Sequence, residues 1–91
     1  DFLLQALNVS AGGMLIKSDL NIMDENANLL FDFPLGSKSL CCEAQIVRRR
    51  PENDFYLYGC KLLNSESDKA EMRKFVFQTQ IKARKIDFDL D

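Results

Sequence analysis

Residues 8–14 read NVSAGGM and lie between two apolar runs, FLLQALNV and GMLIK. A tight hairpin needs only two turn residues, whereas this stretch contains an amide, a hydroxyl and a pair of glycines. Both apolar runs are short and bounded by turn residues, so they predict strands over residues 2–9 and 13–18. The stretch between them predicts a turn that carries more polar chemistry than a hairpin requires.

Three further segments have the composition or alternation of antiparallel strands. They are LLFDFPLG (29–36), SLCCEAQIVRRR (39–50) and FYLYGCKLL (55–63). In the first of them Leu29, Phe31 and Phe33 share one face. Gly59 inside the last segment predicts a bulge or a close approach of another backbone. The polar residues 19–28 suit a loop between strands.

The C-terminal part of the chain has a different period. Residues 65–85 contain neither Gly nor Pro, and Ser65 followed by Asp68 resembles a capping box in which Asp replaces the usual Glu. A stripe at helical spacing consists of Met72, Phe75, Val76, Thr79 and Ala83. We predict one helix over residues 65–85, with Phe75 and Val76 packed against the strands. Antiparallel strands followed by one helix predict a mostly β fold, a small barrel or strongly curved sheet covered by the helix.

Charge is unevenly distributed along this chain of 91 residues, whose net charge is −2. Residues 46–85 hold ten Lys or Arg against five Asp or Glu, whereas residues 1–45 hold two against six. Such a basic region attracts an anion locally, but the overall balance argues against a nucleic-acid polymer as partner. No apolar run reaches the ~20 residues of a membrane span, so we expect no direct membrane insertion. We divide the chain into a domain at residues 1–86 and an acidic tail, DFDLD, at residues 87–91.

The reactive residue types are few. Cys41, Cys42 and Cys60 make an odd number without a CxxC spacing, and the chain has no histidine, so we expect no metal site and no cofactor. Adjacent Cys41 and Cys42 should point to opposite faces of a strand. We interpret all three as buried or half-buried residues of a reduced, cytosolic protein. Ser10 has no evident base near it, and we predict that the protein is not an enzyme.

The opening stretch suits an anion. Asn8 and Ser10 are two residues apart, so on a strand their side chains share a face. Gly12 and Gly13 lack Cβ atoms, which lets backbone N–H groups approach a ligand as in anion-binding nests. A second interpretation also stands: Asn and Ser before Gly-Gly form turns in which they bond to their own backbone.

With its surroundings, the segment from Asn8 to Gly13 resembles the (D/N)xSxxG signature of the PilZ domain family. Further segments resemble the family in its own order: LLFDFPLG, CEAQIVRRR, YLYGCKLL and MRKFVFQTQIKARK, in which Gln80 precedes Arg84 by four residues. The resemblance covers nearly the whole chain. It departs from the family at Leu62 and Leu63, one of which replaces a usual Phe.

The resemblance implies a six-stranded antiparallel split barrel with one C-terminal helix. It also implies a cytoplasmic bacterial regulatory domain that binds the second messenger cyclic di-GMP. Asn8 and Ser10 would make polar contacts with the ligand, and Gly13 would allow its close approach. The implied partners are a component of the flagellar motor or of a polysaccharide synthase, which links the domain to motility or biofilm formation. The layout most resembles flagellar-brake proteins.

One element of the family's site is missing from the sequence. The family has an RxxxR motif before the signature, whereas the first Arg here is Arg48. Because the chain begins with Asp1 rather than Met, we expect it to be a fragment whose arginine arm precedes it, and the first strand of the barrel could be missing with that arm. The fragment alone should then bind cyclic di-GMP weakly or not at all. Alternatively, the protein lacks the motif and is a degenerate, PilZ-like protein-interaction module without nucleotide binding.

Two clusters allow more than one interpretation. Arg48, Arg49 and Arg50 form either a phosphate clamp or a solvated strand end beside a turn. Tyr56 and Tyr58 share a face, where they either stack on a base or pack against neighbouring strands. An unrelated barrel for single-stranded nucleic acid would need a basic groove with stacking aromatics, which the net negative charge disfavours.

Overall fold

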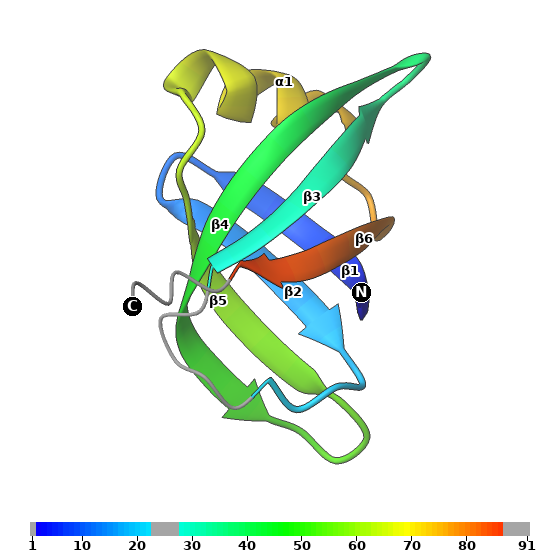
Figure 1. The fold of residues 1–91 in the computed structure, drawn as a ribbon, viewed down its shortest axis with the longest axis vertical. Coiled ribbons are helices and arrows are strands. Elements are labelled where there is room, and N and C mark those ends of the chain that lie inside the picture. The colour runs from blue at the N-terminus through cyan, green and yellow to red at the C-terminus, as the bar shows by residue number, and fades with distance from the viewer. Residues whose placement is uncertain (1, 23–27, 87–91) are drawn as a thin grey trace.

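The structure is a computed structural model that describes residues 2–22 and 28–86. It contains β1 (Phe2–Ser10), β2 (Gly13–Ser18), β3 (Asn28–Leu35), β4 (Lys38–Pro51), β5 (Tyr56–Leu62), α1 (Glu66–Phe75) and β6 (Thr79–Ile86). The strands form a closed barrel in the order β1-β2-β5-β4-β3-β6 (Figure 1). All neighbouring pairs are antiparallel. The predicted fold class, a six-stranded antiparallel barrel with one helix, is confirmed.

The core fills the inside of the barrel with alternate residues of the strands. Leu29, Phe31 and Phe33 are all buried, as their shared face predicts. On β4, Cys42, Ala44 and Ile46 point inward in the same way; all three are buried.

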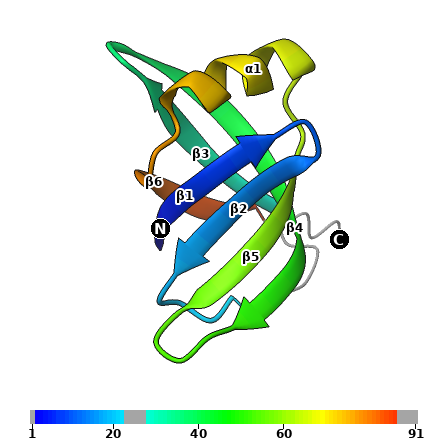
Figure 2. The ribbon, with the colours of Figure 1, turned by 180° about the vertical axis from the view of Figure 1, so that it is seen from behind.

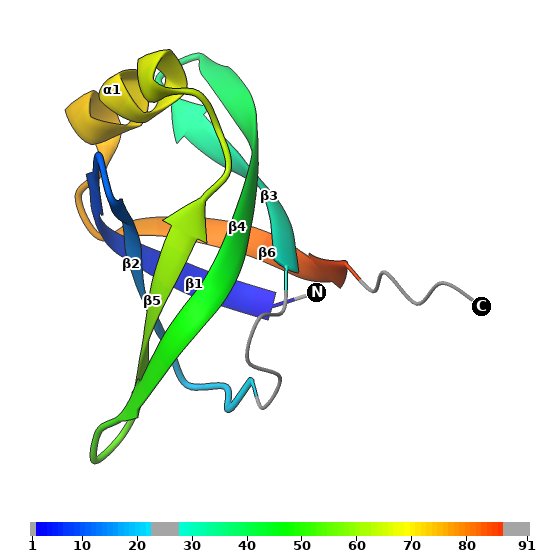
Figure 3. The ribbon, with the colours of Figure 1, turned by 90° about the vertical axis from the view of Figure 1, so that its left-hand side faces the viewer.

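The helix α1 covers one end of the barrel, and the β4–β5 hairpin lies at the opposite end (Figure 3). Its predicted start is confirmed: the Ser65 hydroxyl accepts a hydrogen bond of 3.1 Å from the Asp68 N–H. Met72 is fully buried, with its sulfur 3.8 Å from the Cys42 sulfur. Among the described residues, no helix is long and apolar enough to span a membrane.

The predicted end of the helix, residue 85, is wrong. The helix ends at Phe75, and the Val76 N–H donates to the Met72 carbonyl at 3.0 Å from an extended backbone. Gln78 then adopts a positive φ of 49°. The Thr79 hydroxyl accepts from the Phe77 N–H and donates to the Phe75 carbonyl. These bonds close a turn that sends the chain back as a strand.

Residues beyond this turn form β6 instead of the last helical turns. Ile81 and Ala83 are buried, whereas the side chains between and beside them are exposed: Gln80, Lys82 and Arg84. Phe75, predicted to lie in the core, is 44% exposed, and Val76 is partly buried against the core. The helix is therefore not the last element of the chain.

Strand β6 lies between β1 and β3 and pairs with both. It supplies the sixth strand, so the barrel is closed within the described residues and no position is left for a missing first strand. The predicted acidic tail at residues 87–91, and residues 23–27 of the predicted loop, lie outside the described residues.

The cysteines are all free. Cys42 and Cys60 are buried, and burial raises the pKa of both thiols to about 12. Cys41 lies on the outer face of β4 and is exposed, which corrects its predicted burial. The predicted opposite orientation of Cys41 and Cys42 is confirmed.

Candidate functional site

A β-bulge turns the signature side chains outward. Leu4 and Ala6 on β1 point into the barrel, and strict alternation would also point Asn8 inward. The register of β1 against β2 shifts between Ala6 and Asn8, so that Asn8 lies opposite Leu15. Val9 takes the next buried position, and both Asn8 and Ser10 are exposed. Their predicted common face is confirmed, and it is the outer surface of the barrel.

Gly13 is required by the backbone of the neighbouring strand. Its φ is +151°, and a Cβ atom at this position would lie 2.1 Å from the Cys60 carbonyl oxygen on β5. The predicted close approach therefore exists, but to a strand. Gly12 differs, because a Cβ there would meet only the Ser10 hydroxyl, at 3.9 Å.

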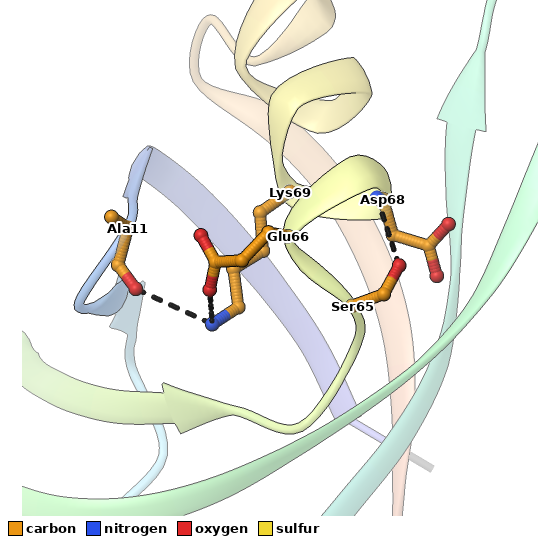
Figure 4. Close-up of polar contacts among 5 residues, drawn as sticks. All are labelled: Ala11, Ser65, Glu66, Asp68 and Lys69. Carbon is orange, nitrogen blue, oxygen red and sulfur yellow. Dashed lines mark hydrogen bonds and ion pairs between the residues drawn. The ribbon is translucent and has the colours of Figure 1, made fainter.

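A nearly buried lysine ties the helix to the signature turn. Lys69 is 8% exposed, and its Nζ donates to the Ala11 carbonyl at 3.3 Å (Figure 4). The same nitrogen pairs with Glu66 at 3.0 Å. Lys69 was not predicted as a functional residue, although its place three residues before Met72 puts it on the buried side of α1.

We expect Lys69→Met to cost about 1 kcal/mol of stability and to accelerate amide hydrogen exchange at residues 11–13, because Met keeps the apolar stem but loses both polar contacts. Chemical denaturation and exchange measured by NMR check this. The control is Lys74→Met, which breaks the exposed pair with Glu71 at the same i,i+3 spacing and should cost less than about 0.5 kcal/mol. Equal amide exchange at residues 11–13 in both variants would contradict a stabilising contact between Lys69 and the turn.

The signature residues line one hollow on the outer surface of β1, β2 and β5, the strands in front in Figure 2. This signature hollow has a volume of about 360 Å³. Its lining consists of Asn8, Ser10, Gly12, Gly13, Met14, Leu15, Val47, Arg48, Gly59 and Cys60. The structure thus brings Asn8, Ser10 and Gly13 together, and it adds Arg48 from β4.

A second bulge carries Arg48 to this surface. Ile46 is buried, and strict alternation would point Arg48 into the barrel as well. The register of β4 against β5 shifts between Ile46 and Arg48, leaving Val47 as the extra residue and placing Arg48 opposite Gly59. The predicted irregularity at Gly59 is thus found in the partner strand.

The Arg48 side chain lies over Gly59. A Cβ atom on Gly59 would be 3.4 Å from both Nε and Nη2 of Arg48. A methyl group at this position would just touch the guanidinium, whereas a larger or branched side chain would take the place that the guanidinium occupies. The Arg48 side chain therefore packs directly against the backbone of β5 at Gly59.

A second hollow adjoins the first. This arginine hollow, of about 520 Å³, is lined by Leu15, Arg48, Arg49, Arg50, Leu57 and Gly59. It shares Leu15, Arg48 and Gly59 with the signature hollow. Among the described residues, neither hollow has an Asp or Glu in its lining, so both surfaces favour an anion.

The two tyrosines do not form a stacking surface. Tyr58 is fully buried; its hydroxyl donates to the Leu20 carbonyl at 2.5 Å and accepts from the Ile22 N–H at 2.7 Å. Burial raises the pKa of Tyr58. The rings of Tyr56 and Tyr58 are 6.4 Å apart. The packing interpretation holds, with Tyr58 fixing the chain that follows β2.

One comparison with known proteins identifies a family. The family model of the PilZ domain matches residues 2–78, which includes β1 to β5 and α1. Comparison with curated proteins and with solved structures gave no match. Within the described residues, no group of His, Cys, Asp and Glu side chains is arranged to hold a metal ion. Since the matched segment spans most of the chain, the chain belongs to the PilZ domain family, a family of cyclic di-GMP-binding regulatory domains.

Proposed function

We propose that the chain is a cyclic di-GMP-binding regulatory domain whose ligand lies in the signature hollow. The observation that carries this proposal is the bulge in β1, which turns Asn8 and Ser10 out of the core and into one hollow with the Gly12-Gly13 backbone. Polar side chains at a re-aimed strand end are typical of binding sites.

The chemistry of the hollow matches a guanine nucleotide. The Asn8 amide offers both donors and an acceptor, as the edge of guanine requires, and the Ser10 hydroxyl can donate to a phosphate oxygen. Neither side chain has a hydrogen bond to another described residue that would compete with a ligand. The ligand would change a docking surface for a protein partner in the cytoplasm. We propose a component of the flagellar motor or of a polysaccharide synthase, and no catalysis.

One observation favours a second candidate function. The chain contains no RxxxR sequence, and planar arginine groups are suited to gripping phosphates. Without such groups the barrel would act as a protein-interaction module that binds no nucleotide. Any residues that the gene encodes before Asp1 would distinguish these functions, since an RxxxR there supports the nucleotide receptor.

Calorimetry with cyclic di-GMP tests the proposal on the 91-residue chain and on a version extended by any residues encoded before Asp1. We expect Asn8→Ala and Ser10→Ala each to weaken binding by about 1–3 kcal/mol, the usual cost of a lost polar contact. This equals roughly 5- to 150-fold in affinity.

Matched controls are Asn53→Ala in the β4–β5 turn and Ser67→Ala on α1, both exposed and outside the signature hollow. They should bind as the unmodified chain does. If Asn8→Ala and Ser10→Ala also retained full affinity, the ligand would not lie in the signature hollow. If neither version bound cyclic di-GMP, the nucleotide proposal would be overturned and the interaction module would remain as the candidate function.

A further inference from the structure

Arg48 differs from the other cations near the candidate site. Arg49 donates to the Asn21 side chain, and Arg50 pairs with Glu52 at 2.8 Å. The Arg48 side chain makes no hydrogen bond or ion pair with any other described residue. Its charge is therefore available at the boundary between the signature hollow and the arginine hollow.

The backbone holds Arg48 in this place at some structural cost. The bulge at Val47 interrupts the β4–β5 ladder, and it leaves Val47 itself 54% exposed. Gly59 lacks a side chain that would pack in the strand, and glycine weakens a strand interior. Both features have the same result, which is a guanidinium that lies against β5 at Gly59 and lines the same hollow as Asn8 and Ser10.

We propose that Arg48 is the phosphate-binding cation of the barrel wall and that Gly59 is the residue that positions it; this inference rests on the proposed function. A guanidinium binds phosphate through two parallel N–H donors. The nearby Asn8 and Ser10 bind the attached nucleotide, and the phosphate lies between the two hollows. The barrel then contributes a positive charge of its own, independent of any arginine that precedes Asp1.

The first test removes the charge. Arg48→Ala should weaken cyclic di-GMP binding at least tenfold and reduce its dependence on salt concentration, whereas Arg48→Lys should restore part of the affinity, since Lys keeps the charge but not the paired donors. The control is Arg73→Ala, which removes the same charge from an exposed position on α1. It should bind as the unmodified chain does.

The second test moves the guanidinium without removing it. Gly59→Val places a branched side chain where Arg48 lies. Because Val favours strands, the variant should remain folded and at least as stable, yet bind cyclic di-GMP several-fold more weakly. Gly59→Ala, whose methyl group only touches Arg48, should have a smaller effect. A Gly59→Val chain with full affinity would overturn the positioning role.

A third test asks whether Arg48 binds a phosphate group whatever the identity of the natural ligand. Inorganic pyrophosphate is titrated into the ¹⁵N-labelled chain while the Nε–H signal of Arg48 is followed by NMR. The signal should shift in the unmodified chain and shift less in Gly59→Val. The amide signals of residues 10–15 should move with it, and no longer move in Arg48→Ala.

The outcomes distinguish the two proposals. Equal affinity of cyclic di-GMP for the unmodified chain and for Arg48→Ala would overturn the role of Arg48 and leave the proposed function intact. The protein could also show a pyrophosphate-dependent shift of the Arg48 signal without binding cyclic di-GMP, with or without any residues before Asp1. That result would support the phosphate-binding role of Arg48 and overturn the proposed function. Absence of any response to either anion would overturn both.

Discussion

Gly13→Ala is expected to lower the free energy of unfolding by about 2–6 kcal/mol, the sum of backbone strain and of overpacking against β5. The φ of +151° is one that L side chains rarely adopt, and the Cys60 carbonyl oxygen stands 2.1 Å from the new methyl group. A carbonyl within a strand pair cannot move aside without breaking the β2–β5 ladder. Since small domains have total stabilities of about 5–15 kcal/mol, the variant should be partly or wholly unfolded. Urea denaturation followed by circular dichroism measures the loss.

Gly12→Ala is the matched control for this experiment. The added methyl group would meet only the Ser10 hydroxyl at 3.9 Å, so the change in stability should stay within about 1 kcal/mol. If Gly13→Ala were as stable as Gly12→Ala, the backbones of β2 and β5 would have to lie farther apart than the structure shows. The comparison also establishes that the signature glycine is needed for folding, which a binding assay alone cannot reveal.

Met72→Ala is expected to cost about 2–5 kcal/mol, the range for removing a large apolar side chain from a core. Met72 is the only apolar side chain of α1 that is fully buried, and it contacts Cys42 inside the barrel end. Losing it should loosen the helix. Because Lys69 lies one turn earlier on the same side of α1, the contact with Ala11 should weaken as well.

Denaturation and amide exchange of residues 11–13 provide the two measurements for Met72→Ala. Arg73→Ala, at the next and exposed position of the helix, should change stability by no more than about 0.5 kcal/mol. Loss of stability without faster exchange in the turn would show that helix docking and the Lys69 contact are independent.

Much of the fold could be predicted from local patterns. The strands around residues 8–14, the inward face of β3 and the helix start at Ser65 follow from alternation and capping, which depend on neighbours in sequence. The end of α1 could not be predicted in this way. No Gly or Pro marks the end of the helix. Thr79 and Ala83 fit the helical spacing, and the same residues also fit the alternation of a strand. The pairing of β6 with β1 decides between the two patterns, and it joins residues at opposite ends of the chain, which a local pattern cannot reveal.

Residues of the candidate site could be proposed from the sequence, but their geometry could not. Asn8 and Ser10 were found from their spacing, whereas the bulges that expose Asn8 and Arg48 break the alternation on which a strand prediction rests. A hint exists in both cases, because a polar residue occurs where alternation calls for an apolar one. Lys69 gives the same hint on α1. In a small barrel, a polar residue at a position where the pattern predicts an inward side chain is thus a reason to look for a β-bulge or for a buried polar contact between two elements.

The position of β6 has a consequence for biosynthesis. Of the six barrel strands, β1 is made first and can pair with β2 early, but its other neighbour, β6, is the last barrel strand to be made. Until residues 79–86 emerge, β1 and β3 both present unpaired edges, which are templates for association with other chains. The nascent chain must therefore complete α1 and the turn at Gln78 before the barrel can close. The unpaired edge of β1 stays open to association with other chains for almost all of the time that the domain is being translated.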